Sequence, residues 1–267
     1  MMGNATDHLD EAARRLRAAP AGPIRLGIGG RSIGCVADVD GVRRWLRVVA
    51  VPESDVHPLV WTGTATAHAL PRSVRRPAMQ GGTEWYTGGT RIRAEVIDYI
   101  EEKVCSDTEV LRTELDLTAG WWRSLRASLD ALAAQPTERV PRTQEQLRRV
   151  LVRLFGPSID PTVGTWVTAH GDLRWSNITR RTPYLLDWEF WGAAPAGADA
   201  ATLYCTSLLV PTVADQVYDQ FGDVLTSRDG RLSQLCVAVQ LLRHADHGDL
   251  GDPLRKLIDG ILPTLTN

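Results

Sequence analysis

The spacing of apolar residues predicts a helix and then a group of short strands at the start of the chain. Leucines and alanines recur at helical spacing over residues 7–19, which predicts one amphipathic helix. Short runs of β-branched and alternating residues then predict strands at residues 24–28, 33–39 and 42–49. The turn residues at 38–41 are typical of a hairpin between the last two strands.

The apolar pattern of the later residues predicts two more strands and then a mainly helical half. The predicted elements are a helix at 59–70, strands at 82–89 and 90–100, a helix at 108–134 and a strand at 164–169. Thr143 and Gln146 form the capping-box pattern that begins a further helix. From residue 197 onward the pattern is helical, with breaks expected near Pro211, Arg228 and Gly248.

A group of polar residues directly follows the strand predicted at 164–169. It begins with His-Gly-Asp at residues 170–172, and Asn177 lies five residues after Asp172. Asp187 follows ten residues after Asn177. In an H-x-D-x-x-x-x-N loop the Asp faces an acceptor hydroxyl and the Asn reaches a magnesium ion, while a second Asp bridges the metal and the phosphates. The spacing therefore predicts a site for phosphoryl transfer from a magnesium-bound nucleotide.

The segment from His170 to Ala201 resembles the catalytic segment of the aminoglycoside phosphotransferase and choline kinase-like family, the small-molecule relatives of protein kinases. In that family the segment reads His-Gly-Asp-Leu-His-x-x-Asn-hydrophobic, then hydrophobic-Asp-Trp-Glu, then a Gly, a Pro and an Asp-rich helix start. The corresponding stretches here are residues 170–178, 185–189 and 192–201. Arg174 departs from the pattern, because the family usually has His there.

The resemblance implies an α+β, bilobal protein-kinase-like fold. Residues 1–100 are then a small N-terminal lobe with an antiparallel sheet that binds the nucleotide. Residues 101–267 are a larger helical C-terminal lobe with the catalytic loop and the acceptor site. The order of elements along the chain places the connection between the lobes at residues 95–102, where such folds seat the purine through backbone hydrogen bonds.

The predicted roles follow from the loop chemistry and the resemblance. Asp172 is expected to be the catalytic base, or to orient the acceptor hydroxyl. Asn177 and Asp187 are expected to bind Mg²⁺, and Glu189 to assist the metal or the substrate if a strand continues past Asp187. Structural support of the loop is expected from His170 and, as the resemblance implies, from Asp199.

A glycine-rich segment in the first half is the candidate phosphate-binding loop. Gly29, Gly30 and Ser32 are expected to bring backbone N–H groups close to nucleotide phosphates, although a glycine-rich hairpin turn is also common. Protein kinases hold the phosphates with a third-strand Lys that pairs with a helix Glu. The two lysines of this chain lie elsewhere, and Arg47 occupies the expected place.

Two interpretations of Arg47 follow from the sequence. Arg47 either binds phosphate with its guanidinium or faces solvent from an edge strand. Its partner is also open, because residues 59–70 contain no acidic residue. Glu53 and Asp55, which precede that segment, are the candidates for an ion pair.

Composition and charge narrow the class of protein. A net charge of −2 argues against a nucleic-acid partner, because proteins that bind nucleic acids usually have a concentrated basic face. The four cysteines are scattered without a C-x-x-C pair, which favours reduced thiols. There is no secretory signal pattern and no apolar run long enough to span a membrane, so we expect a cytoplasmic protein without a membrane partner.

Tryptophan is unusually frequent near the catalytic loop. Trp175, Trp188 and Trp191 either stack on a flat acceptor or pack beneath the loop. Trp121 and Trp122 are expected to pack in the core.

Three functions remain open at this point. The first is a kinase that transfers the γ-phosphate of ATP or GTP to a hydroxyl of an antibiotic or a similar natural product, which gives resistance or self-protection. The second is a metabolic kinase for choline, homoserine or a sugar. The third is a nucleotide-binding pseudokinase without turnover. The retention of Asp172, Asn177 and Asp187 argues against the third function.

Overall fold

The computed structural model describes residues 2–27, 30–243 and 245–266. The chain divides into two compact units. The N-terminal unit contains residues Met1–His68 and Arg76–Glu101, and the C-terminal unit contains Ala69–Arg75 and Glu102–Asn267. No helix in the described part of the chain is long and apolar enough to cross a membrane.

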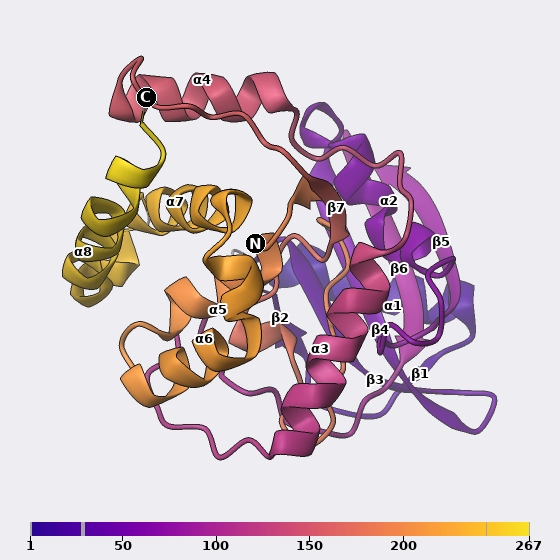
Figure 1. The fold of residues 1–267 in the computed structure, drawn as a ribbon. Coiled ribbons are helices and arrows are strands. Elements are labelled where there is room, and N and C mark those ends of the chain that lie inside the picture. The colour runs from indigo at the N-terminus through magenta and orange to yellow at the C-terminus, as the bar shows by residue number, and fades with distance from the viewer. Residues whose placement is uncertain (1, 28–29, 244, 267) are drawn as a thin grey trace. The chain divides into compact units, whose positions relative to one another are not determined.

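The N-terminal unit is an antiparallel sheet with a helix packed on one of its faces (Figure 1). The strands run in the order β1-β3-β4-β6-β5, and β2 also pairs with β3. Their bounds are β1 Ala19–Pro20, β2 Arg25–Leu26, β3 Ser32–Val39, β4 Val42–Pro52, β5 Met79–Thr87 and β6 Thr90–Asp98. The helices of this unit are α1 Met2–Leu16 and α2 Pro58–Ala67, with a short 3-10 turn at Glu53–Asp55 before α2.

Two tight turns fix the register of this sheet. Asp40 and Gly41 both have left-handed backbone angles, and the Gly41 N–H donates to Asp38 Oδ1 at 2.9 Å. Gly88 and Gly89 adopt the same conformation between β5 and β6. Two left-handed residues in a two-residue loop match the twist of an antiparallel hairpin. The hairpin predicted at residues 38–41 is therefore confirmed.

The core of the N-terminal unit lies between α1 and the sheet. Leu9 and Ala12 of α1 are buried against Leu46 of β4 and Ile92 of β6. These positions follow the helical spacing of α1 and the two-residue alternation of the strands. The predicted helix at 7–19 is confirmed as an element, and it begins earlier, at Met2.

The C-terminal unit is mainly helical and carries one two-stranded sheet (Figure 1). The helices are α3 Ala119–Ala133, α4 Gln144–Phe155, α5 Ala198–Ser207, α6 Pro211–Leu225, α7 Arg228–Leu242 and α8 Gly251–Ile261. The sheet pairs β7 (Trp166–Ala169) with β8 (Gly192–Pro195). Short 3-10 turns lie at Trp175–Asn177, Ala245–Leu250 and Leu262–Thr264. The predicted capping box at Thr143 and Gln146 is confirmed at the start of α4.

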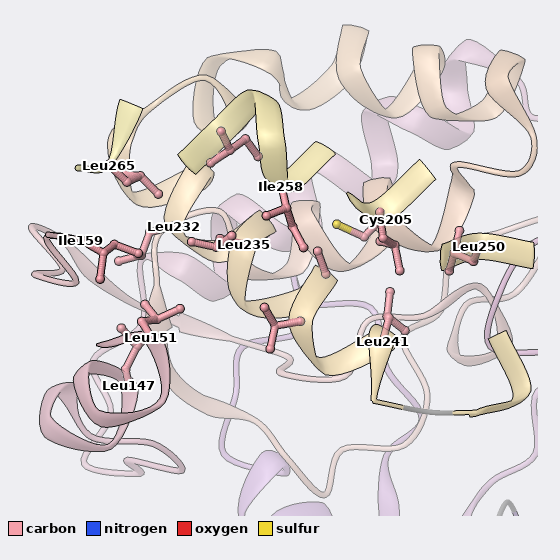
Figure 2. Packing of buried hydrophobic residues seen from close by; sticks show 14 of the residues in the cluster. Leu147, Leu151, Ile159, Cys205, Leu232, Leu235, Leu241, Leu250, Ile258 and Leu265 are labelled. Carbon is pink, nitrogen blue, oxygen red and sulfur yellow. The ribbon is translucent and has the colours of Figure 1, made fainter. Parts of the chain in front are cut away.

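The core of the C-terminal unit is built around α7 (Figure 2). Leu235 of α7 is fully buried in a cluster that also contains Leu151 of α4, Cys205 of α5 and Ile258 of α8. Two of the predicted helical breaks coincide with helix starts, at Pro211 for α6 and Arg228 for α7, and the third, Gly248, lies in the 3-10 turn before α8. The α5 helix is thereby fixed to the core, and its first turn lies against the catalytic loop.

Two predicted elements have wrong bounds. The helix predicted at 108–134 begins only at Ala119, where the Thr118 side chain accepts from the Trp121 N–H and caps it. Before Ala119, the Leu111 N–H donates to the Thr206 carbonyl oxygen at 2.9 Å, outside any helix of its own segment. The predicted connection at 95–102 begins too early, because β6 continues to Asp98 and contains Glu95, while the chain passes from one unit to the other after Glu101.

Candidate active site

The backbone of the catalytic loop is tied to helix α5 by Asp199. Asp199 Oδ2 accepts from the His170 N–H at 2.8 Å, and Oδ1 accepts from the Gly171 N–H at 3.0 Å. Burial raises the pKa of this carboxyl, while the charge of His170 and the two backbone N–H groups oppose the rise. Asp199 lies in the first turn of α5, where a carboxylate also interacts favourably with the helix dipole.

Gly171 is required by the shape of the loop. Its φ is +80°, a region that favours glycine. A Cβ at this position would lie 2.5 Å from the carbonyl oxygen of Phe190. The loop can therefore pass this close to residues 189–191 only with glycine at this position.

His170 holds the loop through both ring nitrogens. Its Nε2 lies 2.8 Å from the Leu186 carbonyl oxygen, and its Nδ1 accepts from the Asp172 N–H at 3.4 Å. Because Nδ1 accepts from a backbone N–H, Nε2 is the nitrogen that donates to the Leu186 carbonyl oxygen. The ring is fully buried and packs edge-on against Trp188, with the centroids 4.7 Å apart. The side chain is thus placed to support the loop.

Both oxygens of the Asp172 carboxylate have partners. Oδ1 is 2.7 Å from Arg174 Nε, and Oδ2 is 3.2 Å from Asn177 Nδ2. Asn177 Nδ2 also donates to the Asp172 carbonyl oxygen at 2.9 Å. Burial raises the pKa of Asp172, the charge of Arg174 opposes the rise, and the charges of Asp187 and Glu109 add to it.

Asp187 reaches the same loop through a short antiparallel bridge. Ile178 pairs with Leu185, and the Leu186 N–H donates to the Asn177 carbonyl oxygen at 2.8 Å. Asp187 then turns the chain with a φ of +62°, an unusual value for a residue other than glycine, and its side chain is exposed. A strained residue of this kind is often part of a functional site.

These residues provide the oxygen ligands that magnesium prefers. Asn177 directs its amide nitrogen to Asp172, which leaves its amide oxygen as the atom suited to a cation, and Asp187 supplies an exposed carboxylate. Within residues 2–27, 30–243 and 245–266, no group of three His, Cys, Asp or Glu side chains is placed to hold a metal by itself. The set fits Mg²⁺ that is shared with nucleotide phosphates, because this ion usually keeps few protein ligands.

The suggested role of Glu189 at the metal or the substrate depended on a strand that continues past Asp187, and the structure has no strand there. Residues 188–189 form a turn, and β8 begins only at Gly192. Arg139 lies beneath this turn, where its Nε donates to the Trp191 carbonyl oxygen at 3.0 Å. Glu189 is half-buried, and a metal or substrate role for it stays a prediction.

The tryptophans near the loop pack beneath it. Trp175, Trp188 and Trp191 are all buried, which excludes them as exposed stacking platforms in this structure. Trp175 donates to Ser207 Oγ at 2.8 Å and stacks on Trp121 at a centroid distance of 6.3 Å. The predicted core packing of Trp121 is confirmed, and so is that of Trp122.

The candidate phosphate-binding residues lie in the N-terminal unit. The Gly27 N–H donates to the Ser32 carbonyl oxygen at 2.9 Å, and the Gly30 N–H donates to the Gly27 carbonyl oxygen at 3.0 Å. Gly30 has a φ of +69° with open space where a Cβ would be. Gly29 lies outside the described residues. Phosphate binding by this turn stays a prediction.

Arg47 lies on a central strand, and its partner there is Glu95. The β4–β6 register places these residues opposite each other, and Arg47 Nη1 is 3.9 Å from Glu95 Oε2. Arg93, two residues earlier on β6, places Nε 2.9 Å from Glu95 Oε1. The Arg47 side chain is only 15% exposed, so the interpretation of Arg47 as a solvent-facing edge residue is wrong.

Glu95 was not among the partners that the sequence predicted for Arg47. Glu53 and Asp55 lie in the 3-10 turn after β4, several residues from the level of Arg47. Glu95 was misplaced in the connection between lobes, although it alternates with Ile92, Ala94 and Val96 as a residue of the opposite face would. Pairing the two strands in register from that alternation would have found it.

The comparison with solved structures gives matches over nearly the whole chain. Spectinomycin phosphotransferase, APH(9)-Ia, in complex with ADP and spectinomycin, aligns with a TM-score of 0.51 at 11% identity, over 93% of this chain and 94% of that chain. The AMP-bound complex of the same enzyme aligns with a TM-score of 0.46 at 12% identity, over 85% and 86%. No protein-family model and no curated protein sequence matches the chain.

Proposed function

Because the chain has an aminoglycoside phosphotransferase-like kinase fold, we propose that it is a small-molecule kinase. The observation that carries the proposal is the arrangement of three side chains. One carboxylate oxygen of Asp172 lies beside the Asn177 amide, and Asp187 follows the short bridge between Ile178 and Leu185. This is the set that phosphoryl transfer needs: a carboxylate for the acceptor hydroxyl, and an amide and a second carboxylate for a magnesium ion.

In the proposed reaction the acceptor hydroxyl lies against Asp172 Oδ2. The oxygen of that hydroxyl bonds to the γ-phosphorus of the nucleotide, the bond from that phosphorus to the β-phosphate oxygen breaks, and the hydroxyl proton passes to Asp172. Asn177 and Asp187 would hold Mg²⁺, which supplies charge neutralisation at the phosphates. Arg47 would bind phosphate with its guanidinium. Backbone N–H groups of Gly30 and Ser32 would also bind phosphate, and the Gly30 N–H would then exchange its bond to the Gly27 carbonyl oxygen for one to the phosphate.

The proposed acceptor is an antibiotic or a similar natural product, and the proposed biological role is resistance or self-protection. Support comes from a solved structure with the same fold, which is a spectinomycin phosphotransferase bound to spectinomycin and ADP. That complex also supports a nucleoside triphosphate as the donor, and both ATP and GTP are tested below. A metabolic acceptor such as choline, homoserine or a sugar is the second candidate, because it uses the same loop chemistry.

Mass spectrometry tests the reaction and the acceptor together. Purified protein, Mg²⁺ and either ATP or GTP are incubated with a panel of aminoglycosides, nucleoside and peptide antibiotics, macrolides, choline and homoserine. We expect one compound to gain a single phosphate. Asp172→Asn keeps the shape of the side chain and removes its negative charge, so transfer should fall by about 100-fold or more.

Nucleotide binding separates the catalytic role of Asp172 from the metal role of Asp187. Asp172→Asn should bind the magnesium-bound nucleotide nearly as well as the wild-type protein, whereas Asp187→Ala should bind it more weakly. Unchanged turnover in Asp172→Asn would remove Asp172 from the mechanism. Nucleotide binding by the wild-type protein without transfer to any compound, and without hydrolysis, would favour the pseudokinase.

A further inference from the structure

Arg174, which departs from the family pattern, lies between two carboxylates. Its Nε is 2.7 Å from Asp172 Oδ1, and its Nη1 forms an ion pair with Glu109 Oε1. The exposed fractions of these side chains are 16% for Arg174, 20% for Glu109 and 21% for Asp172. A guanidinium is a rigid planar fork, so two partners at different nitrogens fix its plane. Arg174 therefore couples the position of Asp172 to that of Glu109.

Glu109 comes from a segment that lies against the catalytic loop. The Cys105 N–H donates to the Ile178 carbonyl oxygen at 2.8 Å, and the Ser106 N–H donates to that of Trp175 at 3.2 Å. On the other side of Glu109, the Leu111 N–H donates to the Thr206 carbonyl oxygen at 2.9 Å. The backbone is thus held both before and after Glu109, which gives Arg174 a fixed partner.

The orientation of the Asp172 carboxylate depends on its two partners. The terminal torsion of an aspartate is broad, so the side chain itself does not fix the plane of the carboxylate. Arg174 contacts Oδ1 and Asn177 contacts Oδ2. Asn177 is also a proposed magnesium ligand. Of the two side chains that contact the Asp172 carboxylate, Arg174 is therefore the one without a proposed metal role. Small errors in such a geometry are costly, because transfer needs an aligned attack.

We infer that Glu109 is a positioning residue for the proposed phosphoryl transfer, acting through Arg174 on Asp172. Glu109 holds Arg174, and Arg174 holds Oδ1, which keeps Oδ2 directed at the acceptor hydroxyl. The inference rests on the proposed function, because it concerns how the same carboxylate is oriented. In this role Glu109 would act only through Arg174, without contacting the acceptor or the nucleotide.

Steady-state kinetics of four variants tests this role. Phosphate release from the nucleotide is measured with water as the acceptor, and transfer is measured with any compound that the wild-type protein phosphorylates. Glu109→Ala should lower kcat on the order of 10- to 100-fold and leave the KM values for nucleotide and acceptor unchanged. Glu109→Gln should lose less, because its amide oxygen still accepts from Arg174. Arg174→Ala and the double variant with Glu109→Ala should be equally slow.

The matched control is Glu114→Ala, on the same segment. Glu114 is exposed and accepts a hydrogen bond from Thr212 Oγ1, so its loss should leave kcat unchanged. Circular dichroism and a urea titration confirm that each variant is folded.

Four results would overturn the inference. A raised acceptor KM with an unchanged kcat in Glu109→Ala would mean that Glu109 contacts the acceptor. Additive losses in the double variant would mean that Glu109 does not act through Arg174. Equal kcat values for Glu109→Ala and Glu114→Ala would mean that Glu109 has no role. A wild-type protein that neither transfers nor releases phosphate would overturn the proposed function, and this inference with it; the first three results leave the proposed function intact.

Discussion

Single residues in the catalytic loop are held by contacts that tolerate few substitutes. Gly171 combines a left-handed backbone with a close approach to the Phe190 carbonyl oxygen. Asp199 uses both carboxylate oxygens on the backbone N–H groups of His170 and Gly171. The loop therefore has little freedom before any ligand binds, and such preorganisation lowers the cost of aligning reacting groups.

The Gly171→Ala variant separates backbone strain from steric conflict. Gly89 has nearly the same φ, +76° against +80°, but has open space where its Cβ would be. Gly89→Ala should cost about 1 kcal/mol of stability, because it adds only left-handed strain. Gly171→Ala should cost more, ~2 kcal/mol or above, because the loop must also move away from Phe190. Urea unfolding measures both values, and equal losses would refute the steric argument.

Some helices and turns of this protein follow from local sequence patterns, and others depend on contacts between distant residues. The capping box of α4 and the turn at residues 38–41 are local signals, so the sequence predicted both. The stretch from 108 to 118 was predicted as part of a helix, but there the Leu111 N–H bonds to the Thr206 carbonyl oxygen, a distant segment that no local pattern indicates. The suggested role of Glu189 depended on a strand that continues past Asp187, and a turn over Arg139 lies there instead.

The grouping of Asp172, Asn177 and Asp187 could be predicted from the sequence, because they lie close together along the chain. One short bridge, between Ile178 and Leu185, links the segments that carry them. Its supporting partner Glu109 was not, since that contact spans many residues of chain and leaves no periodic trace.

The paired strands β4 and β6 contain a buried ion cluster whose loss should be costly. Glu95 is fully buried between Arg47 and Arg93. Glu95→Gln removes the carboxylate charge that both guanidinium groups face, which should lower the free energy of unfolding by about 3 kcal/mol. Glu101→Gln is the matched control, because Glu101 forms an exposed pair with Arg43 and should have little effect. Similar urea midpoints for the two variants would show that the buried cluster is not stabilising.

On the scale of the whole molecule, each unit has its own apolar core, and the cysteines are distributed between them. Cys35 lies in the core of the N-terminal unit and Cys205 in that of the C-terminal unit. Burial raises the pKa of Cys105 to about 12 and that of Cys236 to about 11, and it also raises the pKa values of Cys35 and Cys205. The thiolate is the reactive form, so its formation is disfavoured at all four cysteines. The side chains of Cys35, Cys105 and Cys205 are also buried, whereas Cys236 is half-buried.

Alkylation reads out this protection directly. At roughly pH 8 the folded protein should gain no iodoacetamide adduct on the time scale in which the urea-unfolded protein gains one at each cysteine. Intact-mass spectrometry counts the adducts, and peptide mapping assigns them. Rapid labelling of Cys35 or Cys205 in the folded protein would contradict the burial of these cores.

The position of Glu95 on a strand has a consequence for control of the proposed kinase. In protein kinases the phosphate-holding Lys pairs with a Glu on a mobile helix, and displacement of that helix switches the enzyme off. Here Arg47 and Glu95 are opposite each other in hydrogen-bonded strands, and α2 contains no acidic residue. A sheet register does not shift without breaking its ladder of hydrogen bonds. Formation of this ion pair therefore depends on the pairing of β4 with β6 and not on the position of a neighbouring helix.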